Sequence, residues 1–214
     1  MAIYGGLTGQ QMLDRVGYRL EDPDKKKWEE VAHKLPELQS AMVKVVDLID
    51  NHFLTELEVH DTNKTVTAGS MAFSVLTNLP IRNGILNVKV TSGKYCTIRE
   101  VEDLKRTENT YKTGSTTNPL VHIFSEKLVF EPTTIAAADV WYLRGPTTLL
   151  AGSVVCELNI ALHDVVCRFA ESEIWLANNQ VARADRAEKK AMDVIQMLNA
   201  RYAIEQPPGI GGSK

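Results

Sequence analysis

Two His–Asp pairs, His60–Asp61 and His163–Asp164, are the residues whose types and spacing come nearest to a site for chemistry. Metal-dependent phosphohydrolases use such a pair with further histidine and aspartate ligands, because the metal needs several nitrogen and oxygen ligands that converge on it. His60 lies in a strand-like stretch, and Asp164 has a simpler partner in Arg168, one helical turn further on. We therefore interpret both pairs as structural and keep a soluble metal-dependent hydrolase as the alternative.

The chain has three cysteines, Cys96, Cys156 and Cys167, and no two of them form a CxxC motif. An odd number without such a motif predicts reduced thiols, with neither a disulfide framework nor a structural zinc site. Cys156 and Cys167 are about three helical turns apart, so we expect them to share a buried helix face. A serine nucleophile in a G-x-S-x-G turn is also missing from the sequence. We expect no catalytic residue, no metal and no cofactor.

The composition is that of an ordinary globular protein, with 44% hydrophobic and 24% charged residues in 214. The formal net charge is −3, which argues against a dedicated nucleic-acid-binding protein, since such proteins normally carry a basic excess. No apolar run approaches roughly 18 residues, so we expect no membrane span. Residues 1–6 lack the basic and apolar regions of a signal peptide, and we expect synthesis in the cytoplasm.

Helices are predicted at the start of the chain. Thr8 followed by Gln11 is typical of a capping box, which predicts a helix to about Arg19. Pro36 suits the first turn of a second helix. Apolar residues then recur at helical spacing, which indicates one buried face; they are Leu38, Met42, Val45, Val46, Ile49 and Phe53.

The middle of the chain favours strands, because β-branched residues alternate with polar ones there. Asn83–Gly84 is typical of a turn, and Ser92–Gly93 predicts a hairpin from residues 86–90 into residues 95–98. The remaining predicted strands are 120–124 and 127–131, joined at Ser125–Glu126, and 139–143; Pro132 ends the second of them. Residues 106–119 are almost entirely polar, which predicts a long exposed loop.

The last third favours two helices. Ser153 is a candidate cap for the first helix, whose narrow polar strip predicts burial on several sides. Asn178–Asn179 predicts its end. The final helix has one apolar stripe and a charged opposite face, where Asp185 precedes Lys189 by four residues. Residues 205–214, rich in proline and glycine, fit neither helix nor strand.

These elements predict an α+β fold, in which N-terminal helices and a C-terminal helical hairpin form a bundle with a small antiparallel β insert. We divide the chain into N-terminal helices, β insert, helical hairpin and flexible docking tail; their ranges are 1–54, 55–150, 151–204 and 205–214.

Three stretches carry a resemblance to a known family. The first is the helix end Val45-Val-Asp-Leu-Ile-Asp-Asn-His-Phe53; the second is Leu128-Val-Phe-Glu-Pro-Thr-Thr134 followed by Asp139-Val-Trp-Tyr-Leu-Arg-Gly-Pro146. The third is Glu157-Leu-Asn-Ile-Ala-Leu-His-Asp-Val-Val166, then Phe169-Ala-Glu, before an alanine-rich charged helix. In these stretches and in the order of its elements, over roughly residues 8 to 204, the chain resembles the head-to-tail connector (adaptor) proteins of tailed phages.

The resemblance implies a structural protein of the virion rather than an enzyme. About twelve copies would close into a ring between the portal and the next tail component. DNA would pass through the lumen without sequence recognition. Another tail-completion or stopper protein is a second alternative.

The resemblance also implies sites. Adaptors are expected to insert C-terminal segments between portal subunits, which makes the tail around Pro207, Pro208, Gly209 and Ile210 a candidate portal-docking segment. Lys25, Lys26 and Lys27 are candidates for contact with DNA or solvent. Arg106, Tyr111 and Lys112 are candidate contacts of the 106–119 loop with a neighbouring subunit or the tail. Among the tryptophans, we expect Trp141 in the core, whereas Trp28 and Trp175 suit either the core or an interface.

Overall fold

The computed structural model describes residues 6–22, 24, 27–99, 113–149 and 152–205. The chain forms two compact units: a helical unit of residues 1–56 and 146–214, and a β unit of Leu57–Gly145 inserted between its two halves. Helices and strands are thus segregated, and the predicted α+β class with a small β insert is confirmed.

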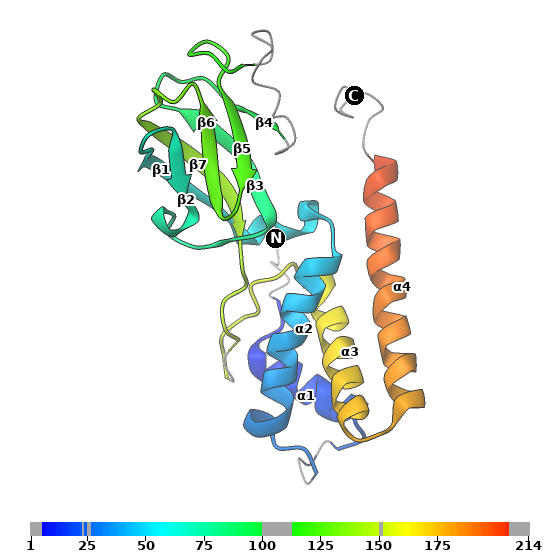
Figure 1. The fold of residues 1–214 in the computed structure, drawn as a ribbon. Coiled ribbons are helices and arrows are strands. Elements are labelled where there is room, and N and C mark those ends of the chain that lie inside the picture. Colours follow the sequence, from blue (N-terminus) through cyan, green and yellow to red (C-terminus); the bar gives the residue numbers. More distant parts are fainter. Residues whose placement is uncertain (1–5, 23, 25–26, 100–112, 150–151, 206–214) are drawn as a thin grey trace, which may run out of the picture. The chain divides into compact units, whose positions relative to one another are not determined.

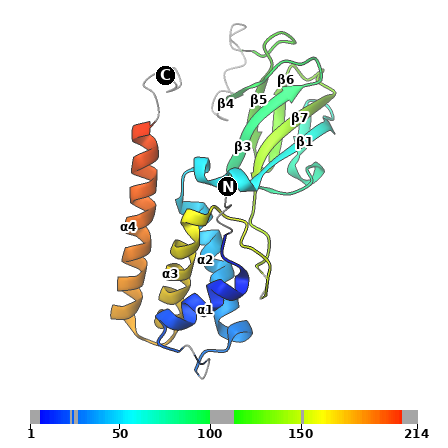
Figure 2. The same cartoon turned by 180° about the vertical axis from the view of Figure 1, so that it is seen from behind.

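The helical unit is built around α3, which packs against α1, α2 and α4. α1 crosses behind α2 and α3 in Figure 1 and in front of them in Figure 2. A π-helical turn, η1, leads into α2, and the 3-10 segment η2 follows it. The bounds are α1 Gly9–Arg19, η1 Glu30–Lys34, α2 Leu35–Leu48, η2 Asn51–Leu57, α3 Ile160–Ala177 and α4 Val181–Glu205.

Local signals set most of these helix ends. The Thr8 side chain accepts a hydrogen bond from the Gln11 N–H, and the Gln11 side chain accepts one from the Thr8 N–H, so the predicted capping box is present. Pro36 lies in the first turn of α2, where its missing N–H costs nothing. Asn178 ends α3, and Asn179 has a left-handed φ of 57° that turns the chain into α4.

The predicted helix start at Ser153 is wrong, because α3 begins at Ile160 with Asn159 as its cap. The preceding segment is extended and lies beside the start of α1. Carbonyls of Val154 and Gly152 accept hydrogen bonds from the first N–H groups of α1, which no intrahelical acceptor can satisfy. Cys156 lies in this segment, so it does not share a helix face with Cys167.

The β unit consists of two sheets around one core. One sheet has the order β1-β7-β3 and is antiparallel; the other has the order β2-β6-β5-β4. Because strands of both sheets contribute to one apolar cluster, the sheets pack face to face. The bounds are β1 Glu58–Thr65, β2 Ser70–Ala72, β3 Pro80–Val90, β4 Thr97–Arg99, β5 Leu120–Phe124, β6 Lys127–Glu131 and β7 Ala137–Arg144; a short 3-10 turn, η3 Phe73–Val75, follows β2.

Two predictions in this unit need correction. Asn83–Gly84 is not a turn between strands but lies within β3, where the pairing with β7 slips in register. The turn at Ser92–Gly93 forms, with Gly93 at φ 86° and the Cys96 N–H bonded to the Val88 carbonyl. β4 then leaves β3 and pairs in parallel with β5, because that edge of the second sheet offers unpaired backbone groups.

The predicted pair of strands around Ser125–Glu126 is present as β5 and β6. In the described part of the chain no helix is both long and apolar enough to cross a membrane.

Candidate functional site

Most of the sequence-predicted contact residues lie outside the described residues. These are Lys25, Lys26, Arg106, Tyr111 and Lys112, together with the tail residues Pro207, Pro208, Gly209 and Ile210. Lys27 is described: it is exposed, and its ammonium lies 5.0 Å from the centre of the Trp28 ring.

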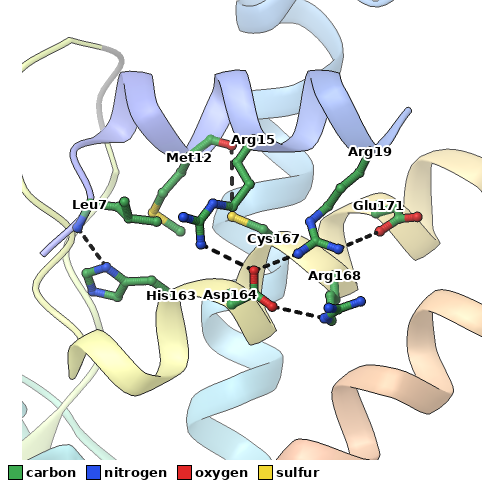
Figure 3. A network of polar contacts seen from close by, with 9 residues as sticks. All are labelled: Leu7, Met12, Arg15, Arg19, His163, Asp164, Cys167, Arg168 and Glu171. Carbon is green, nitrogen blue, oxygen red and sulfur yellow. Dashed lines mark hydrogen bonds and ion pairs between the residues drawn. The ribbon is translucent and has the colours of Figure 1, made fainter. Parts of the chain in front are cut away.

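His163 is buried between α3 and the start of the chain, with both ring nitrogens in hydrogen bonds (Figure 3). The Leu7 N–H donates to Nδ1 over 2.9 Å, so Nδ1 carries no proton. Nε2 lies 2.7 Å from the Leu158 carbonyl and is therefore the protonated nitrogen, donating to that oxygen. Burial lowers the pKa of His163 although the Leu158 carbonyl favours the charged ring. The backbone bonds thus hold a neutral imidazole that has no nitrogen left for a metal.

Asp164, the next residue, points the other way, toward three arginines (Figure 3). Its carboxylate lies 2.6 Å from Arg19, 3.2 Å from Arg15 and 3.0 Å from Arg168. Partial burial opposes its ionisation, but the guanidiniums of Arg19 and Arg168 outweigh this and lower the pKa of Asp164. The carboxylate thus joins α1 to α3, and the predicted Asp164–Arg168 pair is confirmed.

In the other pair, His60 and Asp61 are successive residues of β1, so their side chains point to opposite faces of the sheet. Asp61 is buried and accepts hydrogen bonds from the N–H and hydroxyl of Thr77 and from the hydroxyl of Tyr142. His60 points to the opposite face, where its exposed ring stacks on Trp141 with centroids 4.0 Å apart. Trp141, expected in the core, is only half-buried. Within the described residues, no three histidine, cysteine or acidic side chains are grouped to hold a metal.

The three cysteines are free and buried. Burial raises the pKa of the Cys96 thiol to about 11 and that of Cys167 to about 12. The Cys167 thiol lies against the Met12 carbonyl at 3.9 Å (Figure 3). These thiols stay protonated near neutral pH, which fits packing rather than nucleophilic chemistry.

Two of the arginines that bind Asp164, Arg19 and Arg168, also line a concavity of about 250 Å³ between α1, α3 and α4. We call this concavity the basic groove. Five basic and two acidic side chains line it, with Trp175 and Ala187 as its apolar part; the charged residues are Arg19, Glu21, Arg168, Glu171, Arg183, Arg186 and Lys190. The Arg183 guanidinium lies 4.7 Å from the centre of the Trp175 ring, and Trp175 itself is buried.

The cations of the basic groove are incompletely paired. Arg19 reaches Glu171 at 3.6 Å, and Arg183 reaches Glu21 at 3.5 Å. Arg186 and Lys190 have no ion pair with any described residue, and the buried Nε of Arg19 has no hydrogen-bond partner there. The groove therefore holds an excess of positive charge on a chain whose net charge is −3.

An acidic counterpart, which we call the acidic cluster, lies where α2, α3 and α4 meet. It consists of Glu37, Glu173 and Glu188, with Lys44 among them. Lys44 lies 2.8 Å from Glu188 and 3.3 Å from Glu173. Partial burial and the neighbouring Glu173 raise the pKa of Glu37. One lysine does not balance three carboxylates, so this side of the unit attracts cations.

Sequence reasoning singled out neither surface. The Arg183, Arg186 and Lys190 spacing of three and four residues was visible as part of the charged face of the final helix. Arg19 and Arg168 carried no such signal, because they join the groove only when α1 packs beside α3.

Comparison with known proteins adds nothing to this geometry: no protein-family model matches the chain, and no curated protein sequence matches it.

Proposed function

We propose that this chain is a structural adaptor that closes into a ring and joins the portal of a phage head to the tail. The proposal combines the sequence resemblance with a fold of the kind that the resemblance implies, a helical bundle with an inserted β unit. It assigns the chain to the virion and gives it no catalytic role.

The observation that carries the proposal is the position of α4. This helix has 25 residues, about 37 Å, whereas its packing partner α3 has 18, about 27 Å. Figure 1 shows α4 at the edge of the helical unit, with its C-terminal turns extending beyond the first turn of α3. Its buried stripe is narrow and rich in alanine, and Met197, which lies beside that stripe, is 59% exposed. A long edge helix with uncovered flanks is suited to packing against another chain.

Imaging of assembled particles tests the proposal directly. Phage heads that carry a portal are mixed with the purified chain, and the complex is imaged by electron cryo-microscopy. We expect a ring of this chain at the portal, on the axis of the DNA channel. Density further down the tail would instead identify a tail-completion or stopper protein, and no attachment in the presence of portal would refute both.

A further inference from the structure

The two charged surfaces of the helical unit lie on different sides of the same helix pair. On α3, Arg168 and Glu171 line the basic groove and Glu173 belongs to the acidic cluster. With about 100° per residue, Glu173 is rotated from those two positions by about 140° and 160°. On α4, Arg186 and Lys190 line the groove, and Glu188 is rotated from each by about 160°.

Both surfaces also lie at the same level along these helices. The groove uses residues 168–175 of α3 and 183–190 of α4, and the acidic cluster uses Glu173 and Glu188 within those same turns. A contact between unlike patches on opposite sides of a molecule is heterologous, so it repeats from copy to copy. Such a series closes into a ring when successive copies are related by rotation without a shift along the rotation axis. Patches at one level let successive copies lie side by side without a shift along α3 and α4.

The chemistry of the two surfaces matches. Four of the five basic side chains of the groove are arginines, whose planar guanidiniums bind carboxylates through paired hydrogen bonds. Arg186 and Lys190, which form no ion pair with a described residue, are exposed, as the cations of a docking site must be. The acidic cluster offers carboxylates from three helices, in excess of its single lysine.

We propose that the basic groove of one copy receives the acidic cluster of the next copy, with Glu37 and Glu188 meeting Arg186 and Lys190. This contact rests on the ring-forming function proposed above and names the surfaces that close the ring. It is a contact between copies of this chain, and not a nucleic-acid site.

Charge reversal of each surface tests the contact. The groove-reversed variant carries Arg186→Glu and Lys190→Glu, and the cluster-reversed variant carries Glu37→Lys and Glu188→Lys. Matched controls are Lys189→Glu, which is exposed and adjacent to Lys190 but outside the groove, and Asp193→Lys on the same helix. Thermal unfolding first establishes that each variant is folded. Self-association is then measured by chemical cross-linking and native mass spectrometry, for the full chain alone and on portal-bearing heads.

We expect each reversed variant alone to lose self-association by roughly a hundredfold or more, because like charges then face each other. An equimolar mixture of the two variants should assemble again, since every groove then meets a cluster of opposite charge. Both control variants should assemble as the unchanged chain does.

Several outcomes overturn the inference and differ in what they leave standing. Normal assembly of the groove-reversed variant, or a mixture that stays apart although both variants are folded, removes the contact and leaves the ring intact as a proposal. DNA-duplex binding of the groove-reversed variant is measured alongside. If this variant self-associates normally but no longer binds a DNA duplex, the groove is a nucleic-acid site. Failure of the unchanged chain to assemble, alone or on portal-bearing heads, removes the proposed function itself.

Discussion

At the scale of single residues, His163 and Asp164 show how neighbouring side chains acquire opposite electrostatic states. One turn of α3 directs His163 toward backbone groups and Asp164 toward arginines (Figure 3). The first environment disfavours charge and the second requires it. The dipeptide that resembles a metal-binding motif therefore serves to join α3 to the start of the chain and to α1.

His163 makes the stability of the helical unit depend on pH. Its folded-state pKa is lowered from the ordinary 6.5, so its contribution is fully present above that pH and is lost as the pH falls, when the unfolded chain binds the proton more readily. We expect the free energy of unfolding to decline between pH 7 and pH 5, and His163→Gln, which does not titrate, to remove that part of the decline. Urea unfolding at each pH measures the free energy of unfolding of both proteins. An equal decline with falling pH in the unchanged chain and in His163→Gln would contradict a neutral His163.

Asp61 is the corresponding residue of the β unit. Its carboxylate accepts three hydrogen bonds from Thr77 and Tyr142, and it lies 3.5 Å from Lys64. Burial opposes its charge, but these hydrogen bonds prevail and lower its pKa.

In Asp61→Asn, an amide NH₂ would replace one carboxylate oxygen. That NH₂ is a hydrogen-bond donor and would face the donor groups of Thr77 and Tyr142. We expect Asp61→Asn to lower the free energy of unfolding of the β unit by about 2 kcal/mol. Glu58→Gln, exposed on the same strand, serves as the control and should change little. Hydrogen exchange of the backbone amides of β1 and β7, measured at increasing denaturant concentration, gives the stability of each variant. Equal stability of the two variants would refute the role assigned to Asp61.

At the scale of elements, the loop predicted over residues 106–119 is described only from Thr113 onward. There the Gly114 N–H donates to the Glu131 carboxylate over 2.9 Å, and Ser115 and Asn118 form a turn. This part of the loop is therefore held to β6, and the expected contacts with a neighbour concern residues before it.

We expect limited trypsin digestion of the free chain to cut first at Arg106 or Lys112, because the surrounding sequence has almost nothing apolar to bury. Lys127 and Arg144, within paired strands, are internal controls that should resist. Attachment to portal-bearing heads should slow the cleavage. A free chain that resists trypsin at both loop sites would contradict the prediction.

At the scale of the whole molecule, the proposed function requires a contact with the portal as well as contacts between copies. Residues 205–214 contain two adjacent prolines, three glycines and the single aliphatic side chain Ile210. Adjacent prolines favour an extended backbone, which loses less entropy on docking than a flexible chain does. Under the proposed function, we expect Ile210 to be the side chain that anchors this segment in an apolar pocket.

We expect deletion of residues 205–214 to leave the thermal midpoint nearly unchanged and to abolish attachment to portal-bearing heads. Ile210→Asp in the full-length chain tests the anchor alone and should weaken attachment strongly, whereas Lys214→Ala should not. Normal attachment of the truncated chain would move portal docking elsewhere, most simply to the charged face of α4.

Signals that act over a few residues could be interpreted from the sequence alone. The Thr8–Gln11 capping box, Pro36 in the first turn of α2 and the Asn178–Asn179 break all involve hydrogen bonds or steric limits within one helical turn. The alternation of apolar residues likewise indicated the core strands of the β unit. Such features need no distant partner, so the sequence by itself determined the fold class and most helix ends.

Only the tertiary structure decided what depends on residues far apart in the chain. α3 starts at Ile160 because the segment before it satisfies the first N–H groups of α1, and β4 joins β5 because an edge was free there. The basic groove combines Arg19 of α1 with Arg168 of α3 and Arg186 of α4. In the sequence, each of these charges occupies an ordinary polar position of its own helix. Their convergence follows from how three helices pack, and no local pattern encodes it.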